Sequence, residues 1–126
     1  MGDTRYAIIR IKSGKACLIY LSNTIMHSSR CPYQIGVAGD KLTHADRRDH
    51  LIKQHDIILV GSDGFWDNTK CEEIIRVVTL LANQCNIVPT KQCADHLKAI
   101  AYKRSLSEGV QDDITVLVVQ IIKCKK

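Results

Sequence analysis

Hydrophobic positions along the chain form several short runs that are typical of β-strands. Tyr6–Ile11 and Ala16–Leu21 are two such runs, and the segment between them contains Gly14, a natural turn residue. This order predicts a β-hairpin. Ile57–Val60 is an almost continuous apolar run, which is typical of a strand buried on both faces. The Val/Ile-rich segment Ile114–Ile122 predicts a last strand.

Two longer segments between the last two strands show the spacing of amphipathic helices. Thr69 and Glu72 fit a capping box, with Thr69 as the N-cap residue and Glu72 reaching back to it. The apolar residues that follow repeat at helical spacing and predict a helix over residues 70–83. After Pro89, a second helix is predicted by an apolar face made of Cys93, Leu97, Ile100 and Ala101.

The polar residues between Ser22 and His55 predict mainly a loop, with one short helix near residues 44–53. Phe65 and Trp66 follow the third strand, and we expect them to anchor the turn in the core. The complete order is a strand pair, a loop, a strand, two helices and a strand. Because strands and helices do not alternate strictly, this order favours the α+β class.

Composition limits the classes of function. The chain has 126 residues, of which 45% are hydrophobic and 25% charged, and this suits one globular domain over residues 1–126. The net charge of +5 is spread along the chain and only 5% of residues are aromatic, so we do not expect nucleic-acid binding. The six cysteines form no CxxC pair, and no apolar stretch approaches a membrane span. We expect a soluble intracellular protein, cytoplasmic or mitochondrial, with no targeting segment in this chain and no membrane partner.

Acidic residues stand at the ends of three predicted strands. Asp3 precedes the first strand, Asp63 follows the third, and Asp112 and Asp113 precede the last. If the third and last strands are antiparallel neighbours, Asp63 and Asp112 lie at one edge of the sheet. Clustered carboxylate oxygens are ligands that Mg²⁺ or Mn²⁺ prefers. The alternative is that the aspartate of Asp63-Gly64 only forms a turn, and on the residues alone both interpretations stay open.

Three stretches of the sequence resemble the signature motifs of a known enzyme family. They are "GDTR" (residues 2–5), "DIILVGSDGFWDN" (56–68) and "QDDITVLVV" (111–119), and they are similar to motifs of the metal-dependent, PPM-type (type 2C) Ser/Thr protein phosphatases, in the family's order. The resemblance implies the family's antiparallel β-sandwich flanked by helices. It also implies that Asp63 and Asp112 are metal ligands, that Asp3 contributes to a third, weaker metal position, and that Asp113 supports them. The implied reaction is the attack of a metal-activated water on a phosphoserine or phosphothreonine of a protein substrate, with Mg²⁺ or Mn²⁺ as cofactor.

A fourth stretch indicates a branch of this family. "HSSRCPYQI" (residues 27–35) is similar to a stretch found in a eukaryotic branch with mitochondrial and plastid members. The resemblance implies that Cys31 is a structural residue and not a reactive thiol.

One part of the family's pattern is missing from this sequence. The family's earlier half carries a D-G-H-G-G type motif whose aspartate bridges the two catalytic metals, and this chain contains no His-Gly pair. We therefore expect the chain to be the C-terminal half of the catalytic domain, with little or no activity alone. Its sheet edges are expected to be exposed, which invites association. The alternative is a non-catalytic pseudophosphatase that acts as a binding or regulatory module.

Overall fold

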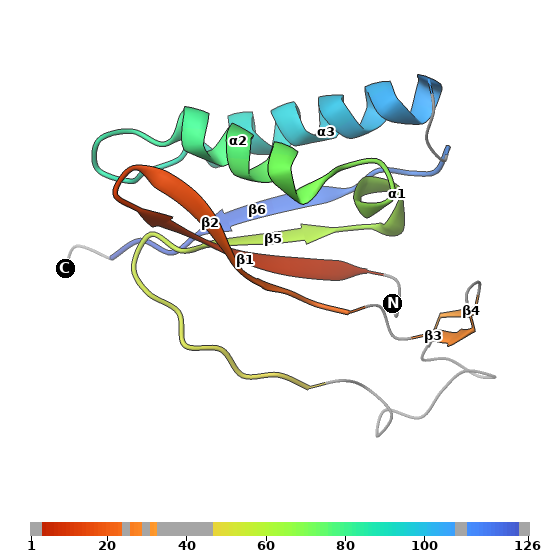
Figure 1. Cartoon of the computed structure of the whole chain (residues 1–126), viewed down its shortest axis with the longest axis horizontal. Helices are drawn as coiled ribbons and strands as arrows, with labels where there is room; N and C mark the ends of the chain where they lie inside the picture. Colours follow the sequence, from red (N-terminus) through yellow and green to blue (C-terminus); the bar gives the residue numbers. More distant parts are fainter. Residues whose placement is uncertain (1–3, 24–25, 29–30, 33–46, 108–110, 124–126) are drawn as a thin grey trace.

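The computed structural model describes residues 4–23, 26–28, 31–32, 47–107 and 111–123, with 26–28 and 31–32 as backbone (Figure 1). Its main feature is a four-stranded antiparallel sheet in the order β2-β1-β5-β6. The strands are β1 (Arg5–Lys12), β2 (Lys15–Leu21), β5 (Ile57–Gly61) and β6 (Val116–Gln120). Two further short strands, β3 (Met26–Ser28) and β4 (Cys31–Pro32), pair with each other. The helices are α1 (Asp63–Trp66), α2 (Cys71–Leu81) and α3 (Thr90–Ser107).

The first two strands form the predicted hairpin. Its turn lies at Ser13 and Gly14, which have φ angles of 52° and 76°. Two successive residues with positive φ give the backbone twist that a two-residue hairpin turn requires. Glycine adopts this conformation without steric cost, so Gly14 fixes the position of the turn.

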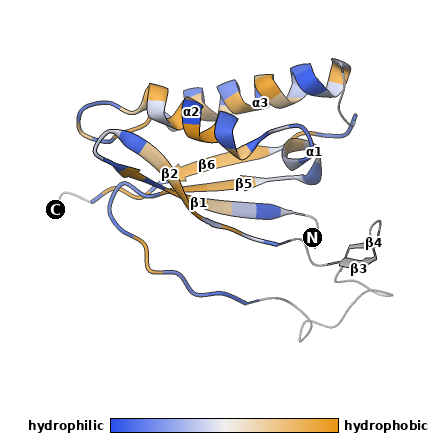
Figure 2. Cartoon of the chain, viewed as in Figure 1, coloured by the Kyte–Doolittle hydropathy of each residue, from blue (hydrophilic) through white to orange (hydrophobic). Residues whose placement is uncertain are grey.

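Helices α2 and α3 cover one face of the sheet, and the core lies between them and the strands (Figure 1). Successive side chains of a strand point to opposite faces of the sheet, so alternate residues point toward the helices. Figure 2 shows hydrophobic residues concentrated along β5 and β6. The helices supply the opposite side of the core with Ile74, Val77, Val78, Cys93, Leu97 and Ala101. Burial raises the pKa of the Cys93 thiol to about 11, as expected for a thiol that serves as a small core residue.

The start of β5 is fixed by a buried carboxylate. The side chain of Asp56 is fully buried, and both of its oxygens accept hydrogen bonds from the Arg10 guanidinium, at 2.9 and 2.8 Å. The backbone N–H of Lys53 donates a further hydrogen bond of 2.8 Å to Asp56 Oδ2. The hydrogen bonds from Arg10, followed by that from Lys53, lower the pKa of Asp56 and outweigh the opposing effect of burial. This pair joins the segment before β5 to the middle of β1.

The other face of the sheet carries apolar side chains that the helices do not cover. Leu117 and Val119 alternate with the core residue Val118 along β6, and they are 55% and 39% exposed. β2 and β6 are the end strands of this sheet. Among the helices of the described residues, none is long and apolar enough to cross a membrane.

Two local predictions are wrong. The helix predicted from residue 70 begins at Cys71, and Lys70 takes the N-cap position, where its N–H donates to Glu73 Oε1 at 2.9 Å. Only one half of the predicted capping box is present, one residue later than predicted, because the Lys70 side chain has no acceptor for a backbone N–H. Thr69 is buried with the preceding residue, and its hydroxyl has no hydrogen-bond partner among the described residues. The short helix predicted near residues 44–53 is absent from 47–53, the part of it that the structure describes, and 44–46 lie outside the described residues.

The larger predictions are confirmed. The chain is an α+β protein with an antiparallel sheet flanked by helices, and the second helix carries Cys93, Leu97 and Ala101 on its buried face as predicted. The loop predicted for residues 22–55 contains the small β3-β4 pair. The stretch that indicates a family branch lies mostly outside the described residues, and the role of Cys31 stays a prediction.

Candidate metal site

Asp63 and Asp112 lie at the same edge of the sheet because β5 and β6 are antiparallel neighbours. Gly61, the last residue of β5, pairs with Val116, the first residue of β6. The backbone pairing continues one step further, where the N–H of Ser62 donates to the carbonyl of Thr115 at 3.0 Å. Asp63 begins α1 directly after this bond, and Asp112 precedes it on the other segment. The predicted arrangement of these two aspartates is therefore present.

The side chain of Ser62 ties the two segments together. Its hydroxyl donates to the carbonyl of Asp113 at 3.1 Å and accepts a hydrogen bond from the N–H of Thr115 at 3.0 Å. Since the hydroxyl is occupied in this way, Ser62 stands at the N-cap position of α1 without capping the helix through its side chain. The chain after β5 therefore forms a short helix and not a simple tight turn. The Ser62 side chain links the start of this helix to the segment before β6.

Gly64 brings α1 into close contact with the aspartate pair. A Cβ atom at this position would lie 2.3 Å from the carbonyl oxygen of Asp113 and 3.3 Å from the Cβ of Asp112. The first of these distances is far below any normal contact, so the approach requires glycine. The backbone between Asp63 and Phe65 therefore packs directly against the base of the Asp112 side chain.

Each carboxylate is oriented by the N–H of the residue that follows it. Asp63 Oδ1 accepts from Gly64 N at 2.8 Å, and Asp112 Oδ1 accepts from Asp113 N at 2.7 Å. Asp63 is half-buried, whereas Asp112 is exposed. Two acidic side chains at one exposed edge, both with hard oxygen donors, fit a Mg²⁺ or Mn²⁺ ion better than Zn²⁺.

The described residues supply only part of a complete metal site. They contain no group of three or more His, Cys, Asp or Glu side chains that could hold a metal ion. Asp3, the third predicted ligand, lies outside the described residues. The residues present therefore fit a divalent cation as two of its ligands, with the remaining positions left to water or to other groups.

Phe65 and Trp66 fix α1 on the core, as predicted. Phe65 is fully buried, and its ring meets that of Trp66 edge-on with centroids 5.0 Å apart. The indole N–H of Trp66 donates to the carbonyls of Gly61 at 3.0 Å and Arg5 at 3.1 Å, and so links α1 to β5 and β1. The Arg5 guanidinium lies 5.6 Å from the centroid of the Trp66 ring.

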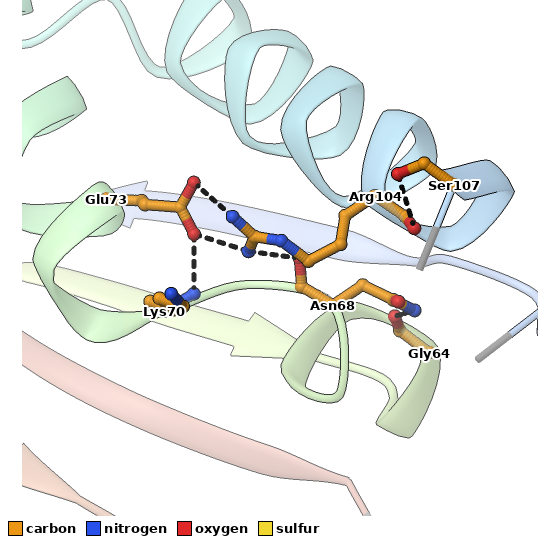
Figure 3. A network of polar contacts seen from close by, with 6 residues as sticks. All are labelled: Gly64, Asn68, Lys70, Glu73, Arg104 and Ser107. Atoms are coloured by element: carbon orange, nitrogen blue, oxygen red, sulfur yellow. Dashed lines mark hydrogen bonds and ion pairs between the residues drawn. The ribbon is translucent and has the colours of Figure 1, made fainter. Parts of the chain in front are cut away.

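A network of polar contacts joins α1 to α2 and α3, and it was not predicted from the sequence (Figure 3). Asn68, which follows α1, is fully buried, and its Nδ2 donates to the carbonyl of Gly64 at 2.8 Å. Arg104 of α3 donates to the carbonyl of Asn68 at 3.0 Å and forms an ion pair with Glu73 of α2. Hydrogen bonding by Arg104 is the main cause of the lowered pKa of Glu73. The sequence distances of 31 and 36 residues explain why no local pattern reveals this network.

The comparison with known proteins decides the family. A protein of Oryza sativa subsp. japonica named as protein phosphatase 2C 24 is 31% identical over 97% of this chain. The chain belongs to the PPM-type, or 2C, protein phosphatase family. A protein phosphatase 2C 26 of Arabidopsis thaliana is 33% identical over 63% of the chain, and the protein phosphatase PTC7 homolog fig of Drosophila grimshawi is 25% identical over 88%. No family model matches the chain.

Structural similarity supports the fold of a PPM-type phosphatase. The photosystem II phosphatase PBCP matches 97% of the chain with a TM-score of 0.69 at 19% identity, a level that shows the shared fold alone. The chain spans less than half the length of these curated relatives, 44%, 26% and 38% respectively, and 56% of the PBCP chain. The described residues therefore correspond to a part of the PPM-type architecture that includes the Asp63–Asp112 edge.

Proposed function

We propose that this chain supplies two metal ligands, Asp63 and Asp112, to a metal-dependent protein serine/threonine phosphatase. The observation that carries the proposal is the close approach of Gly64 to Asp112 and Asp113, which brings the two aspartates of the family's motifs to one edge of the sheet. Sequence similarity to proteins named as 2C phosphatases supports the reaction class. Asp3 is proposed as a contributor to a further, weaker metal position.

The residues of the chain would hold the cation and keep its place fixed relative to the sheet. When bound, Mg²⁺ or Mn²⁺ supplies an activated water and neutralises the negative charge of the phosphoryl group. Asp63 and Asp112 would bind the cation through carboxylate oxygens, and the backbone hydrogen bond that each accepts at Oδ1 helps to fix the direction of its carboxylate. The substrate class is a phosphoserine or phosphothreonine of a protein.

The chain alone is proposed to have little or no phosphatase activity. Two aspartates leave most of a cation's coordination positions to water, and such a site binds weakly. The sequence also lacks the D-G-H-G-G type motif that supplies the bridging aspartate in the family. The localisation proposed with this function is cytoplasmic or mitochondrial.

A titration with Mn²⁺ tests the metal site directly. Mn²⁺ is paramagnetic and broadens the NMR signals of nearby amides even when it binds weakly. In the chain as it exists, we expect broadening first at Gly64 and Asp113, and its loss in Asp63→Asn. Asp95→Asn removes the same charge from an exposed position of α3 and should leave the broadening unchanged. Broadening that spreads over many surface carboxylates with no preference for Gly64 and Asp113 would contradict the proposal.

Phosphate release from a phosphopeptide with Mn²⁺ separates the enzyme from the non-catalytic alternative. Release above that of Asp63→Ala would show that the chain is active alone. Specific Mn²⁺ binding without release is the expected result. The absence of both Mn²⁺ binding and phosphate release would favour the pseudophosphatase, which is supported by the lack of a group of three or more possible ligands in the part of the chain that the structure describes.

Association through the sheet is proposed as a further property of the chain. The end strands β2 and β6 and the exposed side chains of Leu117 and Val119 are the features that support it. Sedimentation of the chain over a range of concentrations should show self-association, and Leu117→Lys should reduce it. A monomer at all concentrations would refute this part of the proposal.

A further inference from the structure

Arg104 is the one side chain of the network in Figure 3 that joins three helical segments. It extends from α3, and its Nη2 donates to Glu73 Oε2 of α2 at 2.9 Å. Its Nη1 donates to Glu73 Oε1 and, at 3.0 Å, to the carbonyl of Asn68 just after α1. A planar guanidinium can hold a carboxylate and a carbonyl at fixed angles, which a lysine ammonium cannot do.

The Arg104–Glu73 pair is poorly explained as a device for stability alone. Its side chains are only 23% and 16% exposed, so both charges have lost most of their water. The attraction within such a pair is offset by the loss of hydration, and apolar residues of similar size often stabilise a fold equally well. What an apolar pair could not do is donate a directed hydrogen bond to Asn68.

Asn68 carries the effect of Arg104 to the metal ligands. Its backbone carbonyl receives the Arg104 hydrogen bond, and its buried side chain donates to the carbonyl of Gly64. Gly64 in turn donates its N–H to Asp63 Oδ1 and packs against the carbonyl of Asp113. Each step is a hydrogen bond or a backbone contact, so a shift of Asn68 moves the peptide that holds both aspartates in place.

We propose that Arg104, oriented by Glu73, is a positioning residue that sets the geometry of Asp63 and Asp112 for a divalent cation. The inference rests on the proposed function, since it names a residue that acts on the same metal site. Arg104 acts on the two aspartates through Asn68 and Gly64. A group that hydrogen-bonds a metal ligand directly typically changes metal affinity by about 10- to 100-fold, and Arg104, which acts through Asn68 and Gly64, is expected at the lower end of that range.

The test compares four substitutions in the full chain. Arg104→Met removes the hydrogen bonds to Glu73 and to the carbonyl of Asn68, and it keeps most of the side-chain volume. Arg104→Lys keeps the charge but loses the planar fork. Glu73→Gln keeps an acceptor for the Lys70 N–H and weakens the orientation of Arg104. Lys91→Met is the matched control, because it removes one cation from the same helix, in an exposed pair with Asp95.

Two measurements are made on each variant. Mn²⁺ affinity is taken from the paramagnetic broadening of the Gly64 and Asp113 amides. Hydrogen exchange is measured at the Asp67 N–H, which donates to the carbonyl of Asp63 at 2.8 Å and reports on the closure of α1. Leu59, in the buried part of β5, serves as the exchange reference for the fold as a whole. This reference keeps the test valid where a variant is less stable, since only exchange in excess of Leu59 is counted.

Arg104→Met is expected to weaken Mn²⁺ binding about tenfold and to speed exchange at Asp67 relative to Leu59. Arg104→Lys and Glu73→Gln should give smaller effects of the same kind, and Lys91→Met should change neither quantity. The proposal would be overturned if Arg104→Met changed neither the Mn²⁺ affinity nor the rate of hydrogen exchange at Asp67. It would also be overturned if hydrogen exchange became faster by the same factor at Asp67 and at Leu59.

Failure of the proposed function gives a different result. If the unsubstituted chain shows no specific Mn²⁺ broadening, the metal site is refuted, and with it the role of Arg104 toward a cation. The exchange data then still decide whether Arg104 holds α1, because this measurement needs no metal. Specific Mn²⁺ binding that Arg104→Met leaves intact refutes the positioning role and supports the metal site.

Discussion

The two ends of β5 carry aspartates in opposite surroundings. Asp56, at the start, is fully buried, and both of its oxygens are bound by Arg10 and by the N–H of Lys53. Asp63, just beyond the end, is half-buried and lies at the edge where Asp112 is exposed. The Asp56 carboxylate is held by a buried ion pair with Arg10, whereas the Asp63 carboxylate lies at the same edge of the sheet as a second acidic residue.

The difference shows how a structural carboxylate is distinguished from a candidate ligand within a single motif. Both aspartates belong to the stretch that resembles the phosphatase signature, and their residue type and spacing alone do not separate them. Their surroundings do, because a buried carboxylate needs a permanent cationic or N–H partner, while a pair of carboxylates at an edge gains from an added cation.

Removal of the Asp56 charge is expected to have the largest effect on stability. Asp56→Asn leaves the Arg10 guanidinium beside a neutral amide, and we expect the free energy of unfolding to fall by about 3 kcal/mol. Urea denaturation followed by tryptophan fluorescence measures this change. Asp95→Asn, in an exposed pair with Lys91, is the matched control and should change stability by less than about 1 kcal/mol. Equal losses of stability in the two variants would show that the buried Asp56 carboxylate matters no more for the fold than an exposed one.

A side chain at Gly64 should disturb the other end of the strand. Gly64→Ala places a methyl group 2.3 Å from the carbonyl oxygen of Asp113, so α1 and the segment before β6 must separate. We expect a loss of about 2 kcal/mol, as for an overpacked core, together with weaker Mn²⁺ broadening at Asp113. An alanine variant with unchanged Mn²⁺ broadening would show that this close approach does not matter for the site.

Acid should lower the stability of the fold through the Asp56 carboxylate at the start of β5. Arg10 lowers the pKa of Asp56, so the stability contributed by this carboxylate is present above its ordinary pKa of about 3.9 and is lost as the pH falls through the lower folded-state value. Glu73, whose pKa is also lowered, adds to the loss in the acid range. Urea denaturation at a series of acidic pH values should therefore show a steeper decline for the unsubstituted chain than for Asp56→Asn. The same slope for both would contradict the assigned role of Asp56.

Substitution of Asp63 should have the smallest effect on stability and a decisive effect on metal binding. Asp63→Asn keeps an oxygen that can accept from Gly64 N and reduces the negative charge beside Asp112. The free energy of unfolding should change by no more than about 0.5 kcal/mol. Mn²⁺ broadening at Gly64 should disappear, which is the reverse of the pattern expected for Asp56→Asn. A large loss of stability in Asp63→Asn would indicate that this carboxylate is structural as well.

The sequence predicts the fold better than it predicts the side-chain contacts that support the candidate metal site. Short apolar runs rich in β-branched residues reveal the hairpin, β5 and β6, and helical spacing of apolar residues reveals α2 and α3, because these patterns reflect burial in the core. Antiparallel pairing of β5 with β6 then brings Asp63 and Asp112 together, as the strand-end positions suggest.

Two features depend on tertiary contacts and escape the sequence. The N-cap position lies at Lys70 and not at Thr69, and Asn68 and Thr69 are buried in the interior, which no local propensity indicates. Arg104 meets Glu73 and Asn68 only after α3 packs beside α2. On a solvent-exposed helix the same arginine would be an ordinary charged residue.

The Ser62 hydroxyl has a consequence for how the two segments align. Because it donates to the carbonyl of Asp113 and accepts from the N–H of Thr115, it fits only one alignment of the end of β5 with the start of β6. A slip of one residue would shift β6 and the segment before it by about 3.3 Å along β5, and so displace Asp112 relative to Asp63. This hydroxyl therefore sets the spacing of the two carboxylates, although it need not touch a cation.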